Sequence, residues 1–124
     1  MEALVTLSSK HTVKETVDQL IILLERHGMA IYARINRQAE SKWHELETRP
    51  MECILFDKPQ LSGPVIQKYP VLALCFPMRI IVWEENGCQI AYKDPAVMLQ
   101  MYDPVPEEFL WPDLRTDILQ AIQK

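Results

Sequence analysis

The stretch Asp57–Pro64, with the sequence DKPQLSGP, combines the residues best suited to hold an anion. It lies between an apolar strand and a predicted helix start at Pro64, so the backbone N–H groups of Ser62 and Gly63 could point at a ligand. Lys58 adds a positive charge, and the helix dipole would contribute about 0.3 to 1 kcal/mol. The stretch therefore predicts an anion site, with a second interpretation in which Ser62 only caps the helix.

Two groups could support catalysis. Asp57 follows an apolar strand and could act as an acid or base, and Cys53 could pair with His44 as nucleophile and base. The sequence shows neither an orienting third group nor an oxyanion feature beside them. An enzyme of unidentified reaction, with Asp57 or Cys53 as its reactive group, is therefore an alternative hypothesis, and no catalytic residue is assigned.

The cysteines and histidines give no pattern of metal ligands. Cys53, Cys75 and Cys88 are odd in number and lie in or beside apolar stretches, which is typical of buried structural thiols. The histidines stand singly, without i,i+4 or CxxC spacing. They are His11, His27 and His44. We expect no metal site and no cofactor.

The composition predicts one domain over residues 1–124. The chain has 48% apolar residues, and its 13 basic and 17 acidic residues give a net charge of −4. Without a basic stripe to neutralise phosphates, nucleic acid is a poor partner. The longest apolar runs are too short to cross a membrane, and the N-terminus lacks the pattern of a secretory signal. We expect a cytoplasmic protein.

The first elements follow from hydrophobic periodicity. Residues 3–7 alternate as a strand, and Thr12 with Glu15 forms a capping box at the start of a helix that runs to His27. Gly28 is expected to end this helix in a left-handed conformation. A second strand is predicted over Met29–Ile35, with Arg34 on its solvent side.

The middle of the chain is interrupted by prolines. Residues 36–46 predict a short amphipathic helix that covers a sheet edge and inserts Trp43 into the core. A third strand follows over Met51–Phe56. The next predicted helix runs from Pro64 to Tyr69, and Val71–Phe76 is expected to be a buried helical turn or an extended segment.

A β-hairpin is the clearest local prediction. Strands at 78–85 and 89–92 flank Asn86-Gly87, a dipeptide typical of tight hairpin turns. Asp94 and Pro95 then start a helix to about Tyr102. A final helix, capped by Asp113, places its apolar residues on one face. They are Leu114, Ile118, Ala121 and Ile122.

The predicted order β-α-β-α-β-α-β-β-α-α favours an α+β fold. Each helix needs one apolar surface, and there are few long crossovers, so a doubly wound sheet is disfavoured. We therefore expect a two-layer sandwich, with about five mostly antiparallel strands and helices packed on one face of the sheet.

Several segments, in this order and spacing, resemble the family called domain of unknown function 302. They are TVDQL, RHGMAIYARI, RPMECILFDKP, YPVLALCFPMRIIVWEENG and AYKDP, and they span residues 12–102, with 103–124 as a C-terminal helical extension. The resemblance implies a compact α+β fold and dimers. It implies no activity, cofactor or catalytic residue.

The chain departs from the family pattern at its central loop. Asp57-Lys58 stands where the family has Gly-Asn, and Ser62-Gly63 where it has Gly-Thr. Asn36-Arg37 replaces an Asp-His pair after the second strand. If the family has a polar site there, the resemblance implies that this chain has altered it.

A non-enzymatic small-ligand-binding or sensing module that acts as a homodimer is the leading hypothesis. A structural or protein-interaction domain is the alternative from another class. The expected ligand is a small anion, held by loop residues, charged groups and an aromatic wall. These residues are Lys58, Ser62, Gly63, Arg37, Arg79, Tyr32, Trp83 and Tyr92. In a competing interpretation, Trp83 and Tyr92 form only a cross-strand pair that stabilises the hairpin.

Overall fold

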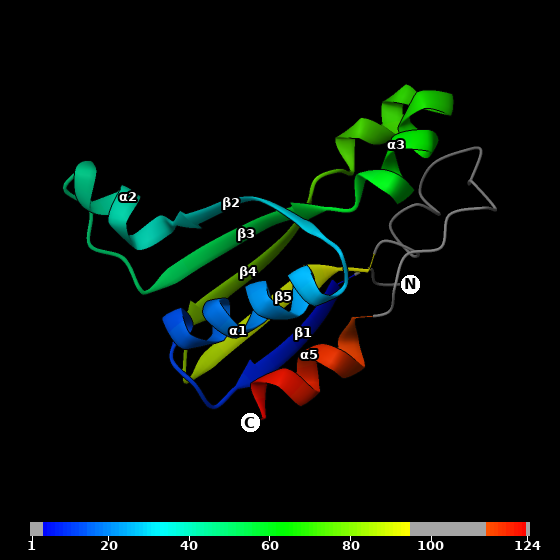
Figure 1. Cartoon of the computed structure of the whole chain (residues 1–124). Coiled ribbons are helices and arrows are strands. Elements are labelled where there is room, and N and C mark those ends of the chain that lie inside the picture. The colour runs from blue at the N-terminus through cyan, green and yellow to red at the C-terminus, as the bar shows by residue number, and fades with distance from the viewer. Residues whose placement is uncertain (1–3, 95–113, 124) are drawn as a thin grey trace.

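The computed structural model describes residues 4–94 and 114–123 and contains one antiparallel sheet (Figure 1). The strands are β1 (Leu4–Ser9), β2 (Ala30–Asn36), β3 (Met51–Asp57), β4 (Met78–Glu84) and β5 (Cys88–Lys93). The helices are α1 (Val13–Arg26), α2 (Arg37–Trp43), α3 (Pro59–Lys68) and α5 (Arg115–Ile122), with a 3-10 turn, η1 (Pro70–Leu74). The helix predicted from Asp94 to Tyr102 and the cap at Asp113 lie outside the described residues.

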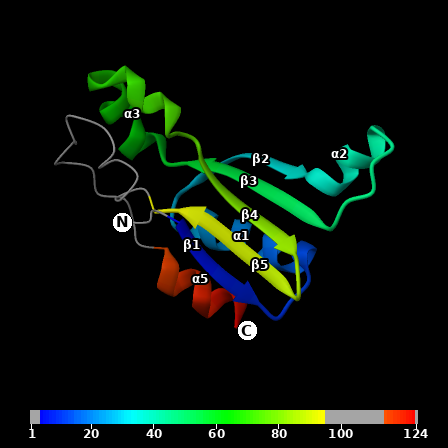
Figure 2. The same ribbon diagram turned by 180° about the vertical axis from the view of Figure 1, so that it is seen from behind.

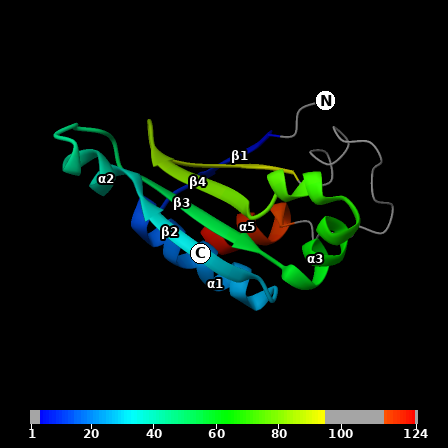
Figure 3. The ribbon, with the colours of Figure 1, turned by 90° about the horizontal axis from the view of Figure 1, so that it is seen from above.

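The strand order is β1-β5-β4-β3-β2, and every neighbouring pair is antiparallel. Helices α1 and α5 lie on the same side of this sheet (Figure 3). The predicted α+β fold, with helices on one face of a five-stranded sheet, is confirmed. We call the side facing α1 the helix face and the opposite side the open face.

Helix α1 forms where the periodicity places it. The Thr12 hydroxyl accepts a hydrogen bond from the Glu15 backbone N–H at 3.1 Å, and the Glu15 carboxylate reaches back to Thr12, so both halves of the capping box are present. This contact also lowers the pKa of Glu15. Val17, Leu20 and Leu24 are fully buried against the helix face. The capping box and the apolar stripe thus fix both the start and the orientation of α1.

The β4–β5 hairpin confirms the turn prediction. Asn86 and Gly87 both have positive φ, 53° and 104°, and Glu84 pairs with Cys88 across the turn. Gly28 also has positive φ, 75°, as its place after α1 predicted. The hairpin register sets which residues of β4 and β5 share a face.

Arg34 is exposed, as predicted, and an irregularity in β2 sets the face of the sheet on which it lies. Ile31 pairs with Phe56 but Ala33 pairs with Leu55, so a β-bulge leaves Tyr32 without a partner. Because a bulge inserts one residue, it reverses which side chains face the helix. Arg34 therefore lies on the helix face.

Helix α2 corrects the prediction for Trp43. The helix extends beyond the end of β2 and β3 and has no buried residue (Figure 2). Trp43 is 88% exposed instead of filling the core. The capping bond from the Ala39 N–H to Asn36 Oδ1, at 2.9 Å, shows that α2 is ordered by local contacts.

Candidate functional site

A groove at the η1 end of the sheet is the main candidate for a ligand site. It has a volume of about 330 Å³ and lies where β4, β5 and β1 meet η1. Its lining is mostly apolar and includes Leu4, Leu74, Cys75, Pro77, Met78, Ile81, Ala91 and Tyr92, together with the cations Arg79 and Lys93. An apolar cleft with a few convergent charged groups is typical of small-molecule sites.

The two cations stand on neighbouring strands. Ile80 pairs with Tyr92, so Arg79 and Lys93 occupy the next position along the antiparallel ladder. Like charges placed opposite each other destabilise a sheet. Within residues 4–94 and 114–123, neither cation makes a hydrogen bond or an ion pair. An anion bound between them would relieve this repulsion.

The structure brings together only part of the predicted ligand set. Arg79 and Tyr92 line the groove, whereas Arg37 lies on α2 and pairs with Glu40 at 3.3 Å. Tyr32 is exposed at the bulge of β2. Lys93 was not predicted from the sequence. Counting residues outward from the Asn86-Gly87 turn along both strands would have placed Lys93 beside Arg79.

The predicted cross-strand pair of Trp83 and Tyr92 is wrong. Trp83 pairs with Gln89 on the open face, and its indole N–H donates to Glu85 Oε1 at 3.2 Å. Tyr92 pairs with Ile80, which is fully buried on the helix face. The two aromatic residues therefore belong to opposite faces of the sheet.

The predicted loop at residues 57–64 is instead the first half of α3. The helix begins at Pro59, five residues earlier than predicted, with Lys58 as its cap. The Ser62 N–H donates to the Lys58 carbonyl oxygen at 3.0 Å, and the Ser62 side chain is buried. Neither Ser62 nor Gly63 stands at a helix start, so they do not form the predicted anion-binding loop.

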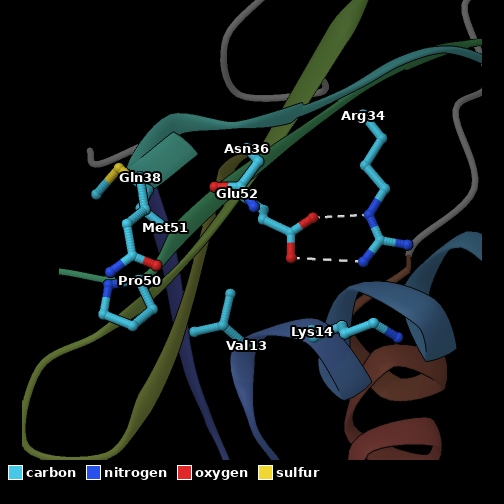
Figure 4. Close-up of a pocket in the computed structure, with 8 residues that line it drawn as sticks. All are labelled: Val13, Lys14, Arg34, Asn36, Gln38, Pro50, Met51 and Glu52. Atoms are coloured by element: carbon cyan, nitrogen blue, oxygen red, sulfur yellow. Dashed lines mark hydrogen bonds and ion pairs between the residues drawn. The ribbon is translucent and has the colours of Figure 1, made fainter. Parts of the chain in front are cut away.

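A second pocket, of about 430 Å³, lies on the helix face between β2, β3 and the start of α1 (Figure 4). Arg34 crosses it and donates from Nε to Glu52 Oε1 at 2.7 Å and from Nη1 to Asp18 Oδ1 at 2.6 Å. These bonds, chiefly the one to Glu52, raise the pKa of Arg34. The charges of this pocket are thus paired within the protein, whereas those of the groove have no partner among the residues that the structure describes.

Comparison with known proteins places the chain in a family. It matches the family described as Domain of unknown function DUF302 over residues 5–124. The chain belongs to the DUF302 family. The match extends on both sides of residues 12–102, the region that carried the resemblance in the sequence.

Two curated relatives of this DUF302 domain are named as ion channels. The chain is 30% identical over 101 residues to fluoride-specific ion channel FluC 1 of Brucella suis and to FluC 2 of Brucella melitensis. The aligned segment is 80% of this chain but only 40% and 37% of those proteins. The DUF302 chain therefore spans about two fifths of the relatives it matches. No helix among the described residues is long and apolar enough to cross a membrane.

A solved DUF302 protein has the same fold. The crystal structure of an uncharacterized conserved DUF302 protein from Bacillus stearothermophilus superimposes with a TM-score of 0.80. It is 19% identical and covers 98% of this chain and 96% of its own. Because the identity is low, this likeness supports the fold alone.

The two candidate reactive groups of the DUF302 domain, Asp57 and Cys53, are buried. Asp57 is buried, and its Oδ1 accepts the Lys58 backbone N–H at 2.7 Å beside the start of α3. Cys53 is buried on the open face, and loss of solvent raises the pKa of its thiol. The described residues include no group of three or more His, Cys, Asp or Glu side chains that could hold a metal ion.

Proposed function

We propose that this DUF302 domain is a non-enzymatic small-ligand-binding or sensing module that acts as a homodimer in the cytoplasm. The single observation that carries the ligand proposal is the pair of adjacent cations, Arg79 and Lys93, in an apolar groove, neither of them paired within the described residues. This combination suits a small anion with an apolar part. The negative group would lie between the cations and the apolar part against Leu74, Ile81 and Ala91.

The homodimer is supported by exposed apolar surface. Several large apolar side chains among the described residues are exposed, and they are Leu4, Ile22, Tyr32, Trp43, Leu46, Val71 and Leu74. Surface of this kind, together with the edge strands β1 and β2, which pair on one side only among the described strands, is typical of association sites. The cytoplasmic location is supported by three cysteines that are free and buried.

The relatives support a sensing role. In the FluC proteins, the matched region is a minor part of a chain whose name describes an ion channel. As part of such a longer chain, a ligand-binding domain would signal the presence of a small molecule to the larger assembly. For this chain, fluoride is one anion to test, with chloride as its control.

Thermal unfolding in the presence of small anions tests the ligand proposal. The set should contain fluoride, chloride, phosphate, acetate and medium-chain carboxylates. A ligand at a hundredfold excess over its Kd stabilises the native state by about 2.7 kcal/mol and raises Tm accordingly. We expect the largest shift with a carboxylate that carries an apolar chain.

Charge-removing variants locate the site. Arg79→Gln with Lys93→Gln should abolish the shift, whereas Lys10→Gln removes an exposed lysine at the opposite end of the sheet and should preserve it. The proposal is wrong if no anion raises Tm, or if the double variant responds like the parent protein.

A further inference from the structure

The open face of the sheet has an apolar centre. Strands β3 and β4 direct alternate side chains to this face. They include the apolar Met51, Cys53, Leu55, Ile81 and Trp83, with Arg79 toward the η1 end. Four of these apolar side chains are only half-buried, since no helix among the described residues lies over them (Figure 3). A sheet normally buries one face and solvates the other, so an apolar second face needs a partner.

We infer that the open faces of two copies pack against each other, with Ile81 close to a two-fold axis. This inference rests on the homodimer proposed above and specifies its surface. The middle strand of the sheet is β4, and Ile81 is the fourth of its seven residues. The most central open-face side chain is thus apolar, as expected for the core of an interface.

The open face is close to the size that a specific dimer interface needs. Five strands spaced about 4.8 Å apart and rising about 3.4 Å per residue give a plane of about 500 Å². Two such faces, taken as flat planes without the extra area of protruding side chains, bury about 1,000 Å² in total. This area reaches the approximate lower bound for specific interfaces. Trp83 and Met51 are also residue types enriched in such interfaces.

Both ends of the sheet carry exposed apolar residues. Trp43 and Leu46 lie at the α2 end and are 88% and 57% exposed, and Leu74 lies at the η1 end and is 80% exposed. A two-fold axis parallel to the sheets and perpendicular to the strands places the α2 end of one copy over the η1 end of the other. In this arrangement, each apolar end meets an apolar end.

The charges agree with this orientation. The α2 end, residues 37–49 with 84–85, carries three basic and five acidic side chains. Among the described residues, the η1 end has the opposite balance, with Lys58, Lys68, Arg79 and Lys93 against Asp57 and Asp94. An axis parallel to the strands would bring ends of like charge together. Complementary charge therefore favours the perpendicular axis.

The inferred interface has a consequence for the ligand groove. Arg79, Ile81 and Ala91 belong both to the groove and to the open face. The α2 end of the second copy would close the groove from above. Ligand binding and dimerisation are thus expected to be coupled.

Sedimentation velocity of the full chain at micromolar concentration tests this interface. The parent protein should sediment as a dimer of the 14.5 kDa chain. Ile81→Glu should raise the dimer dissociation constant by about a hundredfold or more, because two unpaired carboxylates would face each other across an apolar surface. The matched control is Ile22→Glu on α1, which is 51% exposed on the outer side of the helix layer and should remain dimeric.

If circular dichroism shows that Ile81→Glu does not fold, a second variant still tests the interface. Trp43→Ser combined with Leu74→Ser changes only residues that are at least 80% exposed, so it should leave the monomer folded. It should raise the dissociation constant about tenfold or more, as expected for an exposed aromatic anchor. A parent protein that sediments as a monomer overturns both the homodimer and this surface. A dimer that survives Ile81→Glu, or an unchanged dissociation constant in the double variant, overturns the surface alone.

Discussion

Arg34 and Glu52 are joined on the helix face by a hydrogen bond of 2.7 Å from Nε to Oε1, although they lie 18 residues apart. The side chain of Glu52 is only 9% exposed, and that of Arg34 is 33% exposed. The β-bulge at Tyr32 makes this contact possible, since it turns Arg34 toward α1. A carboxylate is thereby stabilised in a nearly buried position.

Removal of Arg34 should therefore destabilise the protein. Arg34→Leu leaves the Glu52 carboxylate buried without its partner, and we expect the free energy of unfolding to fall by about 2 to 3 kcal/mol in a urea titration. The double variant Arg34→Leu with Glu52→Leu should recover much of this loss, because no charge remains to be desolvated. Equal losses in the single and double variants would contradict the role of the pair.

The acid side of the stability profile should depend on Asp18. Hydrogen bonds from Arg34 and then Lys14 lower the pKa of Asp18 below its usual 3.8. Its stabilising contribution is thus fully present above the unfolded-state value and is lost as the pH falls through the lower folded-state value. Asp18→Asn should flatten the decline in Tm below about pH 4. Glu25→Gln on the same helix serves as the control and should leave the decline unchanged.

The cysteines should be nearly inert in the folded protein. Burial raises the pKa of the Cys53 and Cys88 thiols, and Cys75 is buried as well. Since the thiolate is the reactive species, titration with Ellman's reagent at pH 8 should proceed slowly in buffer. Three thiols per chain should react promptly in denaturing urea. Rapid reaction of one thiol in the folded protein would show that it is an accessible nucleophile. That result would favour the alternative hypothesis of an enzyme.

Two glycines should respond in opposite directions. Gly87 has φ of 104°, so Gly87→Val should cost about 1 to 3 kcal/mol of stability, because a β-branched residue is strained there. Gly63 lies within α3, and an added Cβ would meet no atom within 4 Å. Gly63→Ala should therefore stabilise the protein by about 0.4 to 1 kcal/mol. Urea titrations of both variants check this contrast.

Local interactions explain what could be predicted at residue level. The capping box at Thr12 and the Asn86-Gly87 turn both act within a few residues, so the sequence around them is enough to specify the conformation. The apolar face of α5, with Ile118 and Ile122 buried, also follows from spacing alone. The order of such elements then selects the α+β class.

Proline gave an ambiguous signal in α3. Proline favours the first turn of a helix, and both Pro59 and Pro64 could occupy that position. The structure uses Pro59, and Pro64 stands inside the helix. The choice between the two prolines therefore depends on contacts beyond the local sequence. Because the helix begins at Pro59, the predicted anion loop does not form.

The sequence alone determined the elements whose conformation depends on neighbouring residues, and through their order it determined the fold class. Three features depend on the tertiary structure alone. They are the bulge that turns Arg34 toward α1, the exposure of Trp43 and the lining of the groove. Arg79 and Lys93 become neighbours through the hairpin, but Leu4 and Leu74 reach the same groove from distant parts of the chain. Such contacts depend on packing between segments far apart in sequence, which local periodicity does not encode.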